Sequence, residues 1–574
     1  MNVHVTRDTH DPRFLVLAFD FVPSIIAAVK AVPGRQWDKS RKIWLIPDTP
    51  ENVLALHGAL PRGAELVMPV ELRAALRQRY DGLQAGQAIR DAGDHATDFA
   101  FVTQPYAHQR AGLGFLQKLG SGALLWEMGL GKTKTAIDYC QWLAEQAGIG
   151  GSHFRVLVIA PNSVTDNWVA EVEKHTGQRG MALVLRGTLR ARALAVEQIS
   201  LLPRYTIVNT EALSLDPLAS ALVSYPWDVV IVDESTRFKS PKANRTKNLH
   251  KMNCWVRLIL TGAPITNSPE DAWSQFEFVQ PGLLGSWWHF QDACLVKDYF
   301  GNIIGLKPGA GADLAKRINS RSYRILKADV LDLPPKVYVD RHVELAAEQK
   351  KAYQQMKHDL MVEIENAPRV TAATILVQLL RLTQITAGMV GGGDNYAWLP
   401  DGAKVAELDH LLNEELAGEP VVVFGLYQRE LEELARRYYP AERFYPGQEK
   451  PHLPIIYGPT PTPIRTRLIE EFQAGRRRLL FIQSRTGGIG INLTAARTAI
   501  YYTRGWSLED YLQSQDRLHR IGQTGTVTIL HLVAKGTVDE DIAKALSEKQ
   551  ELADTLTGDD ARKLAARLLG GKNK

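Results

Sequence analysis

The sequence predicts an α/β protein with two parallel-sheet lobes, a helical insertion between them and a small α+β module ahead of the first lobe. At 574 residues the chain is too long for one hydrophobic core and is expected to form several domains. Short apolar runs alternate with helical stretches from Phe101 to Pro281 and again from Val421, which is typical of parallel sheets wrapped by helices. We therefore expect two similar α/β lobes.

The domain boundaries follow from these changes of pattern. We expect a small α+β module at 1–64, a helical linker at 65–100, a first lobe at 101–284, a helical insertion at 285–415, a second lobe at 416–550 and a helical C-terminal tail at 551–574. The apolar runs expected to form strands of the lobes are Val156–Ile159, Thr206–Asn209, Val229–Val232, Leu258–Leu260, Val421–Phe424, Ile455–Tyr457, Leu479–Gln483, Thr498–Tyr502 and Val527–Val533.

The composition is that of an ordinary globular protein, with 45% hydrophobic and 23% charged residues. Because the net charge is only +5, any contact with nucleic acid must come from local basic surface. The three cysteines lie far apart without a CxxC pair, which argues against zinc ribbons and disulfide frameworks. No apolar run approaches the length of a membrane span, and the N-terminus does not look like a signal peptide.

A glycine-rich turn, EMGLGKT at Glu127–Thr133, precedes a predicted helix at Thr135–Gln146. Such a turn directs backbone N–H groups and the helix dipole at phosphates. Lys132 would reach the β- and γ-phosphates of a nucleotide, and the Thr133 hydroxyl would ligate Mg²⁺. Trp126 stands where the strict phosphate-loop pattern has glycine, so a helix-capping glycine turn is the alternative interpretation.

Two acidic residues, Asp233 and Glu234, follow the apolar run VVIV and should lie at the carboxyl end of a buried strand. Ligands bind at that edge of an open parallel sheet. Asp233 suits the Mg²⁺ shell, and Glu234 suits the polarisation of an attacking water. The alternative is a surface pair that begins a loop.

The segment QSQDRLHRIGQ at Gln513–Gln523 places Arg517 and Arg520 one helical turn apart, so both are expected to point the same way. Arginine is always charged and forks around phosphate oxygens, so the pair suits a γ-phosphate. A solvated helix face is the alternative. The glycine-rich turn, the acidic pair and the arginines, in this order, indicate a site for ATP and Mg²⁺.

These segments resemble motifs of the Swi/Snf-type branch of superfamily 2 helicase-like ATPases, and the resemblance runs from Phe101 to about Lys549. Further similar motifs are VLVIAPNSVTDNWVAEVEKH (Val156–His175), IVNTEAL (Ile207–Leu213), LTGAPITNSPEDAW (Leu260–Trp273), VVFGLYQRELEEL and SRTGGIGINLTAA (Ser484–Ala496). The tail HRIGQ followed by VTILHLVAKGTVDEDI is a feature of this branch. The resemblance implies two RecA-like lobes with ATP bound between them.

The resemblance also implies roles for individual residues. The catalytic residues would be Lys132, Asp233, Glu234, Arg517 and Arg520, with Thr133 and Asp233 on the metal. The residues around the nucleotide would be Gln109, Gly129, Gly131, Lys132, Thr133, Gly488 and Gly490, and Gln109 would read the adenine edge. The candidate DNA contacts are Ser163, Asn167, Thr210, Lys239 and Trp506. Each DNA candidate could instead be a cap, a turn residue or a packed side chain.

Two positions depart from the expected patterns. The helicase-wide pattern has glycine where Asp516 stands, but aspartate is normal in this branch. The family usually carries a histidine where Thr236 stands, and this histidine couples the acidic motif to the segment LTGAPITN. We expect threonine either to weaken that link or to replace it differently.

The N-terminal module resembles the HARP-type domain of annealing helicases through PGRQWD and KIW around a short helix. Its basic residues next to tryptophans would suit phosphate contacts with base stacking. They are Lys30, Arg35, Lys39, Arg41 and Lys42, with Trp37 and Trp44. The alternative is an ordinary small domain with its tryptophans in the core.

The leading hypothesis is a DNA-stimulated ATPase that translocates on duplex or branched DNA, remodelling or annealing it or displacing bound proteins. The alternatives are a strand-separating DNA or RNA helicase, a non-catalytic scaffold, and the motor subunit of a repair or defence assembly. A strand-displacement assay separates the first two, and the intact ATP-site residues argue against a scaffold. We expect a monomer in the cytoplasm of a bacterial or phage-infected cell, or in the nucleus of a eukaryotic one.

Overall fold

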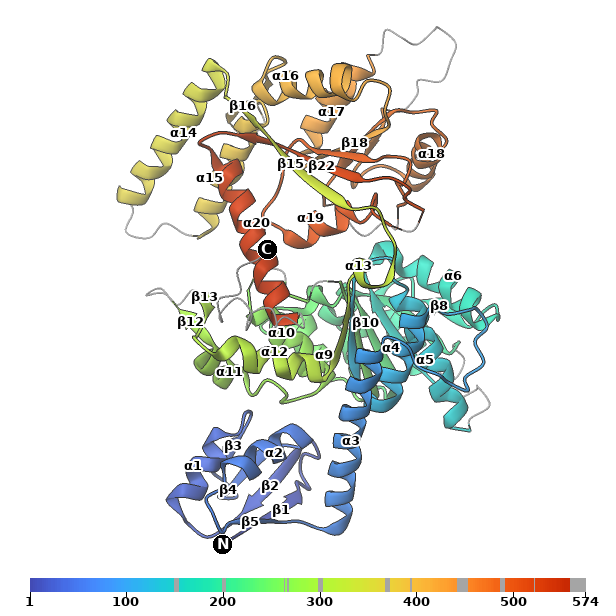
Figure 1. The fold of residues 1–574 in the computed structure, drawn as a ribbon, viewed down its shortest axis with the longest axis vertical. Coiled ribbons are helices and arrows are strands. Elements are labelled where there is room, and N and C mark those ends of the chain that lie inside the picture. Colours follow the sequence, from blue (N-terminus) through green and yellow to red (C-terminus); the bar gives the residue numbers. More distant parts are fainter. Residues whose placement is uncertain are drawn as a thin grey trace. The chain divides into compact units, whose positions relative to one another are not determined.

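The computed structural model divides the chain into two compact units, Met1–Val330 with Glu551–Lys574, and Leu331–Gln550 (Figure 1). It describes residues 1–557 except 149–153, 199–202, 263, 266–267, 298–302, 367–371, 393–394, 441–452, 486–490 and 521. Within this described part, no helix is both long and apolar enough to cross a membrane.

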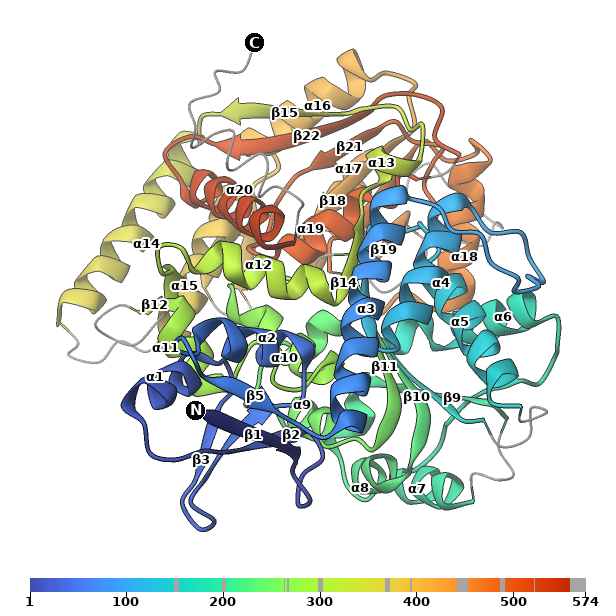
Figure 2. The ribbon, with the colours of Figure 1, turned by 60° about the horizontal axis from the view of Figure 1, so that its bottom comes forward.

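The N-terminal module is a five-stranded sheet in the order β3-β4-β2-β1-β5 with two helices (Figure 2). Its elements are β1 (Asn2–Arg7), β2 (Phe14–Ala18), α1 (Pro23–Ala31), β3 (Gln36–Asp38), β4 (Ile43–Pro47), α2 (Pro50–Ala59) and β5 (Glu65–Val67). Alternate residues of neighbouring strands, such as Val5 and Leu17, form a core with Ile25 and Val29 of α1. This alternation is expected of a sheet with one buried face, and the predicted α+β module is confirmed.

The predicted linker is a long helix that packs against the first lobe. Helix α3 (Val70–Ala92) lies alongside α4 (Ala107–Leu119) and ends at Gly93 in the left-handed conformation. The module also contacts the lobe directly, because Glu51 of α2 forms an ion pair of 3.2 Å with the buried Arg321. The module and the lobe therefore belong to one compact unit.

The first unit holds a seven-stranded parallel sheet in the order β14-β6-β11-β10-β7-β9-β8. Its strands are β6 (Gly122–Trp126), β7 (Val156–Ala160), β8 (Ala182–Val184), β9 (Tyr205–Asn209), β10 (Trp227–Asp233), β11 (Cys254–Leu260) and β14 (Ser322–Ile325). The helices of this lobe are α5 (Lys132–Gln146), α6 (Thr165–Thr176), α7 (Leu189–Glu197), α8 (Leu218–Ser224), α9 (Asn244–His250), α10 (Glu270–Val279), α11 (Trp287–Cys294), α12 (Ala310–Ser320) and α13 (Lys327–Val330). A hairpin of β12 (Leu295–Lys297) and β13 (Ile303–Leu306) stands apart from this sheet.

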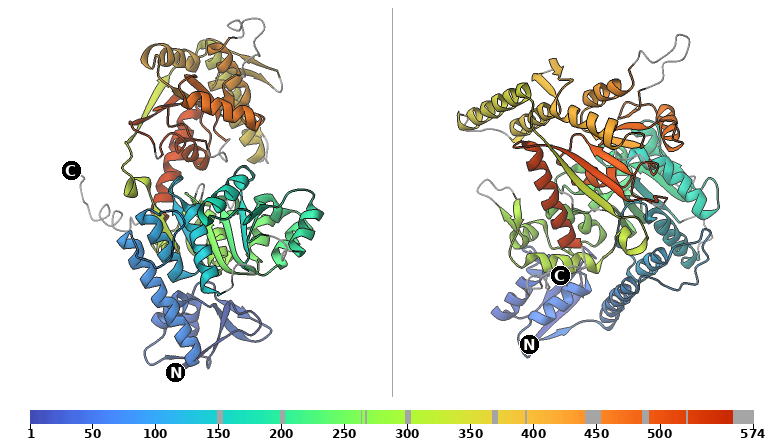
Figure 3. Two further views of the ribbon diagram at one scale, coloured as in Figure 1. Left: turned by 90° about the vertical axis from the view of Figure 1, so that its right-hand side faces the viewer. Right: turned by 45° about the horizontal axis from the view of Figure 1, so that its top comes forward.

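The second unit holds a six-stranded parallel sheet in the order β15-β22-β21-β18-β20-β19, whose first two strands run side by side in Figure 3. Its strands are β15 (Lys336–Val343), β18 (Val421–Gly425), β19 (Ile455–Ile456), β20 (Leu479–Gln483), β21 (Thr498–Tyr501) and β22 (Val527–Ala534). The other elements are α14 (Ala347–Asn366), α15 (Ala372–Thr386), β16 (Met389–Gly392), β17 (Asn395–Trp398), α16 (Ala403–His410), α17 (Gln428–Tyr438), α18 (Thr462–Gln473), α19 (Leu508–Gln515) and the part of α20 (Val538–Thr557) up to Gln550. The two parallel sheets confirm the predicted fold class.

The prediction that residues 285–415 form a helical insertion is wrong in one respect, because this range contains one strand of each parallel sheet. Strand β14 pairs with β6 in the first sheet, and β15 pairs with β22 in the second. Both are edge strands, and β15 carries three consecutive polar residues, Asp340–His342, in place of a continuous apolar run. The division between the compact units therefore falls after Val330 and not at either predicted end of the insertion.

Candidate active site

The loops that follow β6, β10 and β11 lie at one edge of the sheet of the first lobe. Strand β11 lies between β6 and β10, and its last residue Leu260 is in register with Leu124 and with Asp233. The carboxyl ends of parallel strands share an edge, which is where ligands bind in open α/β sheets. The glycine-rich turn after β6 and the acidic pair after β10 are thus brought together, as the sequence predicts.

The glycine-rich turn has the backbone of a phosphate-binding loop. Gly129 and Gly131 have φ values of 88° and 82°, which glycine adopts without strain. Gly131 is the N-cap of α5, so Lys132 and Thr133 occupy the first turn, where unpaired N–H groups attract anions. Trp126, which replaces the usual glycine, is fully buried at the end of β6 and packs edge-on against Tyr323. The departure therefore fills the core and leaves the turn intact.

Lys132 directs its charge into this turn. Its Nζ donates hydrogen bonds to the carbonyls of Trp126 at 2.8 Å and Glu127 at 3.3 Å. These bonds fold the side chain back over the start of the loop. The arrangement concentrates positive potential where phosphates would bind.

Gln109 lies against the same loop. Its side chain is buried, its Nε2 donates to the Leu130 carbonyl at 3.2 Å, and its Oε1 accepts from the Tyr106 N–H at 3.1 Å. A Cβ placed on Gly131 would come within 2.2 Å of the Gln109 Nε2. The amide thus braces the glycine turn, and its reading of the adenine edge stays a prediction.

Asp233 is held by two hydrogen bonds, one to each carboxylate oxygen. Trp168 Nε1 donates to Oδ2 at 2.8 Å, and the Glu234 N–H donates to Oδ1 at 3.0 Å. Burial raises the pKa of Asp233, while the Trp168 bond, the Lys132 charge and the Glu234 N–H lower it. Trp168 is a contributor that the sequence reasoning missed, since no local pattern pairs an indole with a carboxylate 65 positions away.

Glu234 has an unusual backbone conformation. Its φ of 47° and ψ of 57° are left-handed, a region that costs a non-glycine residue about 1–2 kcal/mol. Strained residues of this kind cluster at functional sites. The conformation turns the chain sharply after β10, which suits the predicted role of Glu234 beside the attacking water.

The residue after Glu234 connects the acidic pair to the segment after β11. Ser235 donates its hydroxyl hydrogen to Gln275 Oε1 at 2.6 Å, and Gln275 Nε2 donates to the Pro264 carbonyl at 2.6 Å. Ser235, Thr236 and Gln275 are all buried. A side-chain link therefore joins the two segments beside Thr236, the position where the family usually has histidine.

The two arginines of the second unit are not on a helix, which corrects the expectation that they lie one helical turn apart. Helix α19 ends at Gln515, and the Arg517 carbonyl accepts a hydrogen bond from the Leu493 N–H in place of continuing the helix. Arg517 is 2% exposed, whereas Arg520 is half-buried and donates to the Ile491 carbonyl at 3.3 Å. Burial lowers the pKa of Arg517 to about 10, so it stays charged at neutral pH.

Two further nucleotide candidates, Gly488 and Gly490, lie outside the described residues. Gln523, at the end of the same motif, holds the surrounding loops together. Its Nε2 donates to the carbonyls of Ala496 at 2.9 Å and Leu518 at 3.2 Å. The sequence reasoning assigned it no role.

The DNA candidates differ in exposure. Ser163 and Asn167 are exposed, in the loop after β7 and at the start of α6. Thr210 follows the neighbouring strand β9 and is fully buried, which fits its alternative role in a turn. Lys239 is half-buried and lies 3.8 Å from Asp271. Trp506 packs against an apolar cluster of the second unit, which fits its alternative role as a packed side chain.

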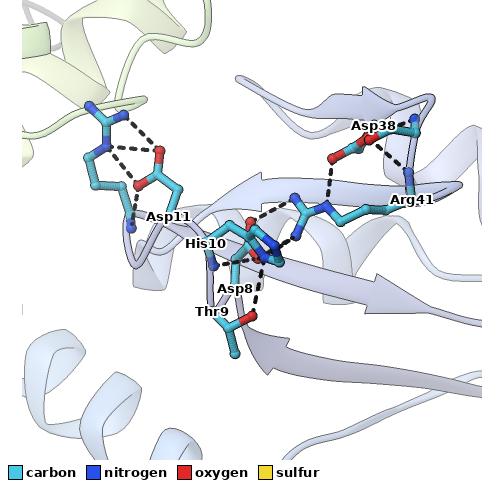
Figure 4. A network of polar contacts seen from close by, with 8 residues as sticks. Asp8, Thr9, His10, Asp11, Asp38 and Arg41 are labelled. Carbon is cyan, nitrogen blue, oxygen red and sulfur yellow. Dashed lines mark hydrogen bonds and ion pairs between the residues drawn. The ribbon is translucent and has the colours of Figure 1, made fainter.

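The N-terminal basic residues separate into two groups. Arg41 bridges Asp8 and Asp38 with bonds of 2.6 Å to each, so it holds the module together (Figure 4). Trp44 packs on the core of the module, and Arg35 faces His289 of the first lobe at 3.3 Å. The exposed group comprises Lys30, Lys39, Lys42 and Trp37, the last with 45% of its surface accessible. The predicted DNA contact of the module therefore concerns mainly this more exposed second group.

The donor set at the sheet edge suits Mg²⁺. The Asp233 carboxylate and the Thr133 hydroxyl offer hard oxygen atoms, and magnesium keeps several waters and substrate phosphates as its other ligands. Each carboxylate oxygen of Asp233 accepts one hydrogen bond. These two bonds orient the carboxylate and leave lone pairs for a metal ion.

A glycine turn at a helix start and an acidic pair at the same sheet edge define a nucleotide-binding lobe of the P-loop class. Residues 108–388 match the model of the SNF2-related domain, and residues 403–522 match that of the helicase conserved C-terminal domain. The chain belongs to the Swi/Snf-type branch of the superfamily 2 helicase-like ATPases.

Relatives come from bacteria and eukaryotes. The uncharacterized ATP-dependent helicase MG018 of Mycoplasma genitalium is 27% identical over 453 residues, which are 78% of this chain and 41% of the relative. The ISWI chromatin-remodeling complex ATPase ISW1 of Saccharomyces cerevisiae is 27% identical, over 75% of this chain and 38% of its own length. Human chromodomain-helicase-DNA-binding protein 1 is 28% identical, over 78% of this chain and 26% of its own length. This chain spans less than half the length of each of the three.

Among solved structures, the SWI2/SNF2 ATPase core of Sulfolobus solfataricus in complex with double-stranded DNA is 25% identical to this chain. The alignment covers 83% of this chain and 98% of that chain, with a TM-score of 0.39.

Proposed function

We propose that this protein is a DNA-stimulated ATPase that translocates on double-stranded or branched DNA, where it remodels or anneals DNA or displaces bound proteins. The observation that carries the proposal is the meeting of the phosphate loop and the Asp233–Glu234 pair at one edge of the first sheet. Family membership supports the same activity.

In the proposed reaction, the first turn of α5 and Lys132 hold the triphosphate. Thr133 and Asp233 would hold Mg²⁺, which supplies charge neutralisation of the β- and γ-phosphates when bound. Glu234 polarises the water that attacks the γ-phosphorus, and the bond to the β–γ bridging oxygen breaks to release ADP and phosphate. Arg517 and Arg520 stabilise the charge that develops on the transferring group, as their motif implies.

DNA is the proposed partner because the exposed Ser163 and Asn167 lie at the same sheet edge as the ATP site. Hydroxyl and amide groups suit the phosphate backbone, and such contacts fix register without reading sequence. The relatives named for chromatin remodelling and for DNA binding support DNA over RNA. The bacterial relative supports the bacterial cytoplasm as the proposed location.

Steady-state ATP hydrolysis with equal concentrations of single-stranded, duplex and forked DNA and of RNA tests the proposal. We expect strong stimulation by duplex or forked DNA, and loss of turnover in Lys132→Ala and Glu234→Gln. The matched controls are Lys174→Ala and Glu197→Gln, at exposed positions of the same lobe. Full ATPase activity in both site variants would refute the proposal, and efficient strand displacement would favour the helicase alternative.

A further inference from the structure

We propose that Trp168 is a positioning residue for Asp233 and that it transmits DNA contact at the loop after β7 to the metal-binding carboxylate. The inference rests on the proposed function and deepens it, because it names a physical route from DNA to the ATP site.

The indole and the carboxylate form a well-defined pair. Trp168 is 1% exposed, and its single N–H donates to Asp233 Oδ2 at 2.8 Å. Since the Glu234 N–H holds the other oxygen at 3.0 Å, the two bonds together set the plane of the carboxylate. Groups that orient a metal ligand in this way govern metal affinity, although they do not touch the metal.

Trp168 lies in the first turn of the helix that follows the candidate DNA-binding loop. The loop is a short 3₁₀ turn at Asn162–Val164, and α6 begins at Thr165. The Thr165 hydroxyl donates to the Asn162 carbonyl at 3.0 Å, so the loop and the helix start are tied together. The exposed Asn167 directly precedes Trp168, so a displacement of this turn by DNA reaches the indole without an intervening hinge.

The rest of α6 is braced against the phosphate-loop helix. Helix α6 packs on α5, and Gln141 of α5 donates to the His175 carbonyl near the end of α6 at 3.0 Å. The far end of α6 is therefore held on the ATP-binding lobe, while its start carries Asn167 and the indole and directly follows the 3₁₀ turn with Ser163. One hydrogen bond, from Trp168 to Asp233, therefore connects the start of α6 to the metal-binding carboxylate.

A purely structural role is the competing explanation, in which the bond only satisfies a buried indole. Trp168→Phe separates the two, because phenylalanine keeps most of the apolar volume and removes the donor. Trp227→Phe is the matched control, since Trp227 is also buried on this lobe and donates to a backbone carbonyl, that of Leu222, at 2.9 Å.

The experiment measures binding of a non-hydrolysable fluorescent ATP analogue to the full chain as Mg²⁺ is titrated, with and without duplex DNA. We expect the Mg²⁺ concentration for half-maximal binding to rise roughly 10-fold in Trp168→Phe and to stay unchanged in Trp227→Phe. Duplex DNA should change the half-maximal Mg²⁺ concentration of the wild type and of Trp227→Phe, but not that of Trp168→Phe.

Trp168→His is a second test variant, because the histidine ring is smaller than the indole but still carries an N–H donor. We expect it to recover part of the Mg²⁺ response that Trp168→Phe loses, while the thermal unfolding midpoints of both variants stay close together. Equal half-maximal Mg²⁺ concentrations for Trp168→Phe and Trp168→His would overturn the inference. A Trp168→Phe value that matches that of Trp227→Phe would overturn it as well. A wild type that ignores DNA altogether would instead count against the proposed function.

Discussion

Ser235 and Gln275 form a buried hydrogen bond of 2.6 Å that joins the acidic motif to helix α10. The Gln275 Nε2 continues the connection to the carbonyls of Pro264 at 2.6 Å and Asp271 at 2.7 Å. One glutamine thus bonds the acidic motif, the segment after β11 and its own helix. The link runs beside Thr236, and it shows how this chain connects its acidic motif to the segment after β11 without the usual histidine.

Replacement of Gln275 by leucine should break this link while filling a similar volume. The Ser235 hydroxyl and the two carbonyls lose their partner, so we expect the free energy of unfolding to fall by about 1–3 kcal/mol. Turnover should fall while nucleotide binding persists, because Gln275 does not contact the phosphate loop in any described bond. Urea unfolding and steady-state ATPase assays measure the two effects.

A double-mutant cycle with Ser235→Ala tests whether the bond itself matters. We expect a coupling energy of about 0.5–3 kcal/mol between the two positions. Strictly additive losses would show that Ser235 and Gln275 act independently.

Gly131→Ala should weaken nucleotide binding through Gln109. Alanine at a φ of 82° is strained, and its Cβ would also meet the Gln109 Nε2 at 2.2 Å and disturb the bond to Leu130. Gly129→Ala is the matched control, because Gly129 has a φ of 88° but, among the described residues other than its chain neighbours, no atom within 4 Å of its Cβ position. Gly131→Ala should be the less stable variant by about 1 kcal/mol, the value of the disturbed hydrogen bond.

The measurement is thermal or urea unfolding of both glycine variants, with and without a nucleotide. The difference between them should disappear in a Gln109→Ala background, where the clash is absent. A difference that persists there would mean that Gln109 does not brace the loop.

Glu430 should make the stability of the second unit depend on pH. It is fully buried, its Oε1 accepts bonds from the Leu426 N–H and the Thr503 hydroxyl, and burial raises its pKa to about 7. The carboxyl has a pKa of 4.5 in the unfolded chain and about 7 in the folded protein. Between these two pH values the folded state keeps the Glu430 proton, whereas the unfolded state loses it. The free energy of unfolding therefore falls as pH rises through this window, by at most about 3 kcal/mol.

Glu430→Gln should remove this slope, since glutamine keeps the acceptor oxygen and carries no charge. Unfolding in urea at pH 5 and pH 8, with the exposed Glu419→Gln as control, measures the difference. Parallel pH profiles for the wild type and Glu430→Gln would exclude titration of this carboxyl.

The exposed lysines at the tip of the β3–β4 hairpin should add to DNA affinity without sequence preference. We expect Lys39→Gln with Lys42→Asn to reduce the slope of log affinity against log salt by about 2, one unit for each lost phosphate contact. Asparagine suits position 42, whose φ is 54°. Duplex binding at several salt concentrations provides the slope.

The control is a pair of exposed lysines on α14, Lys350 and Lys351, for which the sequence predicts no DNA contact. An unchanged slope in the hairpin variant would assign these lysines to the solvated surface of an ordinary small domain. Arg41→Ala should behave differently and destabilise the module, because Arg41 holds Asp8 and Asp38.

The sequence by itself determined the ATP-binding edge of the first lobe. The apolar run before Asp233 and the glycine turn before α5 are local patterns, and local backbone preferences place both at strand ends. Local patterns also predict the positions of individual strands. The strand Leu479–Gln483, for example, is predicted and observed with the same bounds.

Only the tertiary structure decided which side chains meet there. Trp168 reaches Asp233, and Gln275 reaches Ser235 40 positions away, because packing of the helices against the sheet brings them together. The hydrogen bond from the Leu493 N–H to the Arg517 carbonyl likewise joins residues that are distant in the sequence. Periodicity reports which face of an element is buried, whereas hydrogen-bond partners across the fold depend on how those faces pack.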